Sequence, residues 1–149
     1  MPRLAVFLPC LFPLLFAACG EVEDTRPGQP VKTRQQAFKE MIKVFEPMGV
    51  MLREGRYEPE KFLRLASALH ETREAPWTHF AADTNYPPTK ATAQVWEDEA
   101  GFVREKEKFL AATDKLLAAA KAQDETQSKT AYEAVYASCQ DCHKPFKKR

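Results

Sequence analysis

Hydrophobic side chains recur near the start of the chain at alternating steps of three and four residues, which is the spacing of one helical face. The only charged member of this series is Arg34, which either extends its stem toward the surface near the helix start or pairs with an internal anion. Pro47 lies inside the series and should kink the helix or end its regular part nearby. The series comprises Val31, Arg34, Phe38, Met41, Phe45, Met48 and Leu52.

A second helix is predicted to begin at Pro59. Proline has no backbone N–H group, and the first position of a helix does not need one for an intrahelical hydrogen bond. Pro76 marks its end, and residues 75–89 form a loop with aromatic anchors. His70 and His79 fall in this region. Histidines so placed more often have surface or capping roles than contact a metal.

Residues from about Lys90 to Gln123 are predicted to form the longest helix, with apolar pairs that repeat every seven residues. This period indicates shallow, left-handed packing against neighbouring helices. Asp124 is suited to cap a fourth helix that continues through Phe146. Four helices with short links predict an all-α fold, an antiparallel four-helix bundle.

Composition supports a single helical domain and argues against a nucleic-acid partner. The 149 residues include only five glycines, and 22 basic residues almost balance 21 acidic ones. Because no basic stripe is present, the sequence does not favour nucleic-acid binding.

Residues 1–18 have the pattern of an export signal, with Arg3 before an apolar run too short to span a bilayer. Residues 15–20 resemble a bacterial lipobox, in which Cys19 becomes the lipidated first residue, although Phe16 replaces the usual leucine. The alternative is ordinary cleavage after Gly20, which would discard Cys19 and release a soluble protein.

Residues 19–30 are polar and rich in proline and glycine, so we expect a flexible tether ahead of the folded domain at 31–149. The expected location is the periplasm, with membrane anchoring as a lipoprotein if Cys19 is modified.

The most specific motif is Cys139-Gln140-Asp141-Cys142-His143, because C-x-x-C-H is typical of covalent c-type haem attachment. On a helix, Cys142 and His143 fall on either side of Cys139, so one face presents two thiols and an imidazole. His143 would then be the iron's proximal ligand. A structural zinc site would need two further ligands, and the other cysteines, Cys10 and Cys19, lie in the predicted signal.

The chain resembles the cytochrome c′ family, the four-helix-bundle c-type cytochromes that also include the cytochromes c-556. The resemblance covers residues 31–149. Besides the haem motif, it rests on the opening helix at 31–38, on Ala75-Pro76-Trp77 and on Val95-Trp96. It implies one covalent haem c. Because the sequence shows no nucleophile–base pair and no phosphate-binding loop, we do not expect an enzyme that acts on an organic substrate.

The family resemblance also bears on the sixth iron site. Cytochromes c-556 have a ligating methionine at the position of Phe38, whereas cytochromes c′ have a non-ligating apolar residue there. Phe38 therefore implies five-coordinate, high-spin iron that binds NO and CO. The alternative is a six-coordinate, low-spin electron carrier with Met41 as sixth ligand, although such a methionine is more often core filler.

Two basic residues are expected to lie near the haem. Arg34 would pair with a propionate. Lys147, one turn after His143, would influence the proximal pocket or bind a propionate, or with its neighbours would complement the helix C-terminus. The family resemblance also implies a homodimer through the first two helices, and the redox partner protein is not predicted.

Overall fold

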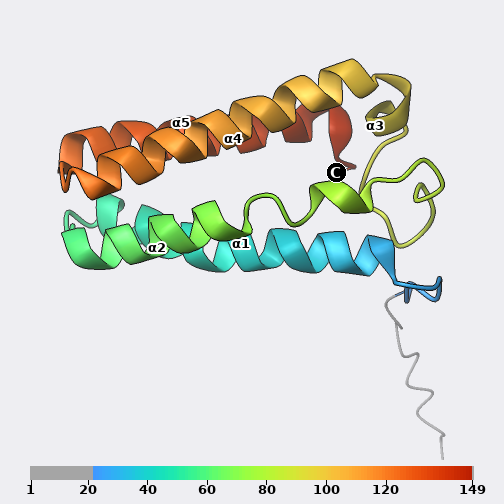
Figure 1. Ribbon diagram of the computed structural model, residues 1–149, viewed down its shortest axis with the longest axis horizontal. Coiled ribbons are helices and arrows are strands. Elements are labelled where there is room, and N and C mark those ends of the chain that lie inside the picture. Colours follow the sequence, from blue (N-terminus) through green and yellow to red (C-terminus); the bar gives the residue numbers. More distant parts are fainter. Residues whose placement is uncertain (1–21, 149) are drawn as a thin grey trace, which may run out of the picture.

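The computed structural model describes residues 22–148, so the predicted signal and Cys19 lie outside the described residues. Four long helices form an antiparallel bundle in two layers, with α1 and α2 in one layer and α4 and α5 in the other (Figure 1). Among residues 22–148, no helix is both long and apolar enough to cross a membrane. The helices are α1 (Pro30–Arg53), α2 (Pro59–Thr72), η1 (Trp77–His79), α3 (Gln94–Glu97), α4 (Glu99–Lys121) and α5 (Glu125–Phe146).

The first, second and fourth predicted helices are confirmed as α1, α2 and α5. Helix α1 continues past Pro47 to Arg53, so the proline does not end it. Asp124 caps α5 as expected, since its side chain accepts a hydrogen bond from the Gln127 N–H group. The turn between α1 and α2 uses Gly55 at a φ of 61°, a conformation that glycine adopts without steric cost.

The predicted helix from Lys90 to Gln123 was wrong in its first part. Residues 90–92 are extended, and they pair with the end of the chain through an antiparallel bridge between Ala91 and Lys147. The short helix α3 follows, and Asp98 interrupts the helical conformation before α4 begins. The physical reason is the Asp98 side chain, which accepts a hydrogen bond from the Gly101 N–H group at 2.9 Å and so starts a new helix.

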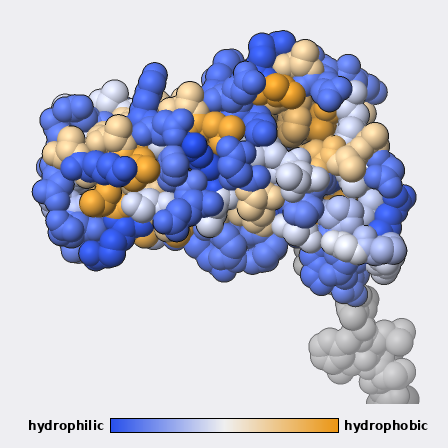
Figure 2. Space-filling view, viewed as in Figure 1, coloured by the Kyte–Doolittle hydropathy of each residue, from blue (hydrophilic) through white to orange (hydrophobic). Residues whose placement is uncertain are grey.

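The interior consists of two hydrophobic clusters. The main core runs between the long helices and includes Met48, Phe62, Leu69 and Leu116, none of them more than 1% exposed. A smaller cluster lies where α3 meets the end of α5, and its buried members are Ala91, Val95 and Phe146. Hydrophilic side chains cover most of the face seen in Figure 2, with smaller apolar areas between them.

Residues 22–29, which were expected to belong to a flexible tether, are attached to the domain at Asp24. This carboxylate is 1% exposed and accepts hydrogen bonds from the Val31 and Lys32 N–H groups at the start of α1. The Tyr86 hydroxyl donates a further hydrogen bond to it at 2.8 Å, so the loop before α3 also holds this segment.

Candidate haem site

The C-x-x-C-H pentapeptide lies near the C-terminal end of α5. Cys139 and Cys142 are both half-buried free thiols, whereas the neighbouring His143 is more exposed. Cys139 packs against the main core and Cys142 packs against the smaller cluster. The two thiols therefore lie at the boundary between the two hydrophobic clusters.

The environment of these thiols keeps them protonated. Burial raises the pKa of Cys139 to about 11. Burial, and then the negative charge of Glu105, raise the pKa of Cys142 to about 12. A thiol with such a pKa is scarcely ionised near neutral pH, so neither cysteine resembles the activated thiolate of a redox enzyme. For His143, burial and then the positive charge of Lys147 lower the pKa, which favours the neutral imidazole that can ligate a metal.

A chain of aromatic rings extends from α1 across the loop to α4 and α5. The Phe38 ring meets the Trp77 ring edge-on, with 5.5 Å between their centroids, and lies 6.3 Å from the Phe80 ring. Phe80 packs against Phe102 at 4.9 Å, and Phe102 against Phe146 at 5.3 Å. These rings give the region around the cysteines apolar walls.

Met41 lies on α1 one turn from Phe38 but is more deeply buried. Its side chain is 5% exposed and belongs to the buried set of the main core. Phe38 is only half-buried and packs against the outside of that set. The structure therefore places the Met41 side chain in the buried core and the Phe38 ring against Trp77.

Lys147 lies directly after the last residue of α5, at its C-cap. Helix α5 ends at Phe146, and Lys147 has an extended backbone while its N–H group donates to the His143 carbonyl. The adjoining Lys148 N–H group donates to the Lys90 carbonyl, and the Thr92 N–H group to the Phe146 carbonyl. Lys147 thus ends the helix rather than continuing the helical face of His143, because the terminal residues pair with residues 90–92.

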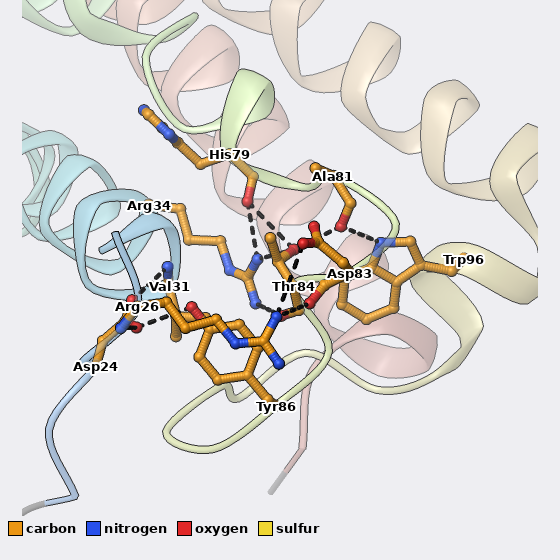
Figure 3. Close-up of polar contacts among 10 residues, drawn as sticks. All are labelled: Asp24, Arg26, Val31, Arg34, His79, Ala81, Asp83, Thr84, Tyr86 and Trp96. Carbon is orange, nitrogen blue, oxygen red and sulfur yellow. Dashed lines mark hydrogen bonds and ion pairs between the residues drawn. The ribbon is translucent and has the colours of Figure 1, made fainter. Parts of the chain in front are cut away.

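Arg34 is 3% exposed, and its guanidinium lies in the loop that precedes α3 (Figure 3). It donates to the Thr84 side chain and carbonyl, to the Thr89 hydroxyl and to the His79 carbonyl, at 2.6–3.0 Å. The central carbon (Cζ) of its guanidinium also lies 4.6 Å from the centroid of the Phe80 ring. Arg34 therefore holds the loop against α1, and its pairing with a propionate stays a prediction.

Two groups in this region were not anticipated. Asp24 and Tyr86 fix the segment before α1, and nothing in the local sequence pairs them. Glu105 is close enough to Cys142 for its negative charge to help raise the pKa of that thiol, after burial. Here a signal was available: Glu105 follows Phe102 by three residues and precedes Phe109 by four, the same spacing as the core positions. His70 bonds Asp114, and the His79 ring points away from Arg34 (Figure 3).

The residues of this region fit a covalently bound haem c. Two thiols three residues apart can each form a thioether, a neutral imidazole follows them, and aromatic side chains supply apolar surroundings. Among residues 22–148, no group of three or more His, Cys, Asp or Glu side chains is placed to hold a metal ion. The further ligands of a structural zinc site are thus not assembled around the cysteines in this range.

Comparison with known proteins points to one family. The family model described as "Cytochrome C'" matches residues 29–147. The cytochrome c′ of Rubrivivax gelatinosus is 31% identical over 126 residues, which cover 83% of this chain and 98% of that protein. Its crystal structure matches with a TM-score of 0.79 and 30% identity, covering 85% of this chain and all of that one.

Two structures of cytochrome c′ variants from Alcaligenes xylosoxidans match almost as well. One is a nitric oxide complex and the other has carbon monoxide bound. Each has a TM-score of 0.78, is 29% identical, and covers 85% of this chain and 100% of the other.

Proposed function

Because this chain belongs to the cytochrome c′ family, whose members bind one covalent haem c, we propose that it is a gas-binding cytochrome that takes up NO and CO and exchanges electrons. The observation that carries the proposal is the placement of Cys139 and Cys142, half-buried between two hydrophobic clusters and adjoined by His143. The relatives with bound NO and CO support the choice of ligand.

Each site residue has a distinct role in this proposal. Cys139 and Cys142 hold the porphyrin through two thioethers, and His143 supplies the proximal nitrogen ligand. The haem iron, when bound, supplies the position at which a diatomic gas binds and the electron that is exchanged. Phe38 has no ligating atom, so it leaves that position open and the iron five-coordinate and high-spin.

The aromatic walls determine which gases are favoured. Phe38, Trp77 and Phe80 present aromatic rings, and the Trp77 indole N–H already donates to the Arg73 carbonyl at 2.7 Å. Bound dioxygen is polar and needs a hydrogen-bond donor, whereas NO and CO bind without one. The proposed site therefore binds NO and CO in preference to dioxygen.

The central test is whether haem stays with the polypeptide. Acid–acetone extraction of the wild-type protein should leave haem attached, and the ferric and ferrous spectra should be high-spin. Cys139→Ala combined with Cys142→Ala should yield a chain without covalent haem. Release of haem from denatured wild-type protein would overturn the proposal.

We further propose that the protein acts in the periplasm and is anchored through a lipid on Cys19. The supporting observation is the lipobox-like sequence at residues 15–20, which lies outside the described residues. Mass spectrometry of the native N-terminus should show an acylated cysteine, and Cys19→Ser should accumulate as unprocessed precursor. A mature chain beginning at Glu21 would establish the soluble form instead.

We also propose the homodimer through α1 and α2 that the family resemblance implies. On α1, the large hydrophobic residues Ile42 and Val50 are 49% and 37% exposed. Ile42→Glu should convert the dimer to a monomer in analytical ultracentrifugation, because it places a charge on this face. Wild-type protein that sediments as a monomer at all concentrations would contradict this assembly.

A further inference from the structure

Glu105 is a half-buried acidic residue for which the proposed haem site has so far given no role. It lies on α4 between Phe102 and Phe109, both of which contact Trp77. Its side chain is 15% exposed, and its Oε1 atom accepts a hydrogen bond from Lys108 at 2.6 Å. Its Oε2 atom is buried and has no hydrogen-bond partner among residues 22–148.

The Glu105 carboxylate lies toward the part of α5 that carries the haem motif. Its negative charge is the second largest cause, after burial, of the raised pKa of Cys142. The hydrogen bond and charge of Lys144 chiefly lower the pKa of Asp141, the residue before Cys142, and the charge of Lys108, the partner of Glu105, adds a smaller effect in the same direction. Phe102, one turn before Glu105, packs in the same cluster as Cys142.

A buried carboxylate oxygen without a partner is costly, so its presence calls for an explanation. Lys108 compensates the charge only in part, because its side chain is 61% exposed and contacts the other oxygen. In a site with little water, a charge acts more strongly on its neighbours than it does at the surface. The group most affected would be a cofactor attached at Cys142.

We propose that Glu105 lowers the reduction potential of the haem, by placing a negative charge near the Cys142 thioether. Ferric haem carries one more positive charge than ferrous haem, so a nearby anion favours the ferric form. The inference rests on the proposed function, since it requires haem at Cys142.

The test compares two carboxylates of α4 in the haem-loaded protein. An electrode supplies the single electron that reduces ferric to ferrous haem, and the absorption spectrum gives the ratio of the two forms. Glu105→Gln keeps the shape and removes the charge, so the ferrous-to-ferric ratio at a fixed potential should rise roughly tenfold, equal to about 59 mV for one electron. Glu107→Gln, at an exposed position on the same helix, should change the ratio far less.

A second variant keeps the proposal falsifiable if Glu105→Gln folds poorly. Lys108→Gln removes the compensating cation and should shift the ratio the other way, toward ferric haem. A Glu105→Gln protein that retains covalent haem but has the wild-type potential would overturn the role of Glu105 alone. A shift of the ratio toward ferrous haem in Lys108→Gln would also overturn the role of Glu105. Failure of the wild-type protein to retain haem would instead overturn the proposed function.

Discussion

Phe38 has no atom that can ligate iron, and its ring packs edge-on against Trp77. Phe38→Met should therefore convert the site toward a six-coordinate, low-spin cytochrome, because a thioether would replace the phenyl ring. Phe38→Ala should instead speed CO association, since it removes a side chain from the wall of the site. Absorption spectra and stopped-flow CO binding measure the two effects.

Met41→Leu is the control for this prediction. Met41 is 5% exposed in the main core, and leucine has a similar volume, so the spectrum should not change. A low-spin wild-type protein that became high-spin in this variant would show that Met41 is the ligand. The electron-carrier alternative would then replace the gas-binding proposal.

Asp24 makes stability depend on pH. Burial alone would raise its pKa, but hydrogen bonds from Tyr86 and from the N–H groups of Lys32, Arg26 and Val31 outweigh burial and lower the pKa. A lowered native pKa stabilises the fold above the unfolded value of about 4, and this stability is lost as pH falls through the native pKa. Asp24→Asn should therefore be less stable than wild type near neutral pH, and the difference should shrink under acid conditions.

Thermal unfolding at several pH values measures this difference. Asp83→Asn is the matched control, because the Asp83 side chain is 81% exposed in the loop that carries Tyr86 and should affect stability little at any pH. A constant difference between Asp24→Asn and wild type across the acid range would contradict the assigned role of the carboxylate.

Single residues differ in how far the sequence predicts their position. Cys139, Cys142 and His143 are adjacent on one helix, so their spacing alone predicts that they act together. Arg34 was recognised as an unusual charge on an apolar face, but its acceptors, Thr84 and Thr89, are about 50 residues further along the chain. Such pairings depend on the tertiary fold.

At the scale of helices, Asp98 decides where α4 begins. The apolar repeat runs through residues 95–117 without interruption, which favours one long helix, but repeat patterns do not report a capping side chain. No local sequence signal indicates the non-helical backbone of residues 90–92 either, because this conformation depends on pairing with residues 146–148 at the chain end. The ends of the other long helices carry local signals, such as Pro59 and Asp124, and were predicted closely.

The Asp98 cap can be tested by two substitutions. Asp98→Ala should lower the free energy of unfolding by about 1 kcal/mol, because the Gly101 N–H group loses its acceptor. Asp98→Asn should retain most of the stability, since asparagine caps about as well. Chemical denaturation of both variants gives the comparison, and equal stability of Asp98→Ala and wild type would show that the cap does not set the break.

For the molecule as a whole, the sequence predicted the bundle but not its division into two hydrophobic clusters. The main core follows the helical periodicities, which are visible in the sequence. The smaller cluster combines Phe80 from a loop, Ala91 from an extended segment and Phe146 from the end of α5. No periodicity connects these positions, so only the structure shows that the haem motif adjoins a second apolar region.

The aromatic chain has an optical consequence for the whole molecule. The protein has two tryptophans, Trp77 and Trp96, and both pack in the region of the cysteines. A haem held there would quench their fluorescence, because it absorbs at the wavelengths where indole emits. Unfolding should raise the emission, since Cys142 is 46 residues from Trp96 along the chain.

Fluorescence would thus report one end of the bundle, whereas far-ultraviolet circular dichroism reports all of the long helices. Coincident transitions would mean that both ends unfold as one cooperative unit. An earlier rise in fluorescence would mean that the end carrying Phe80, Trp96 and Phe146 opens while the α1–α2 and α4–α5 turns stay folded. The two tryptophans therefore serve as a built-in local probe of the gas-binding end.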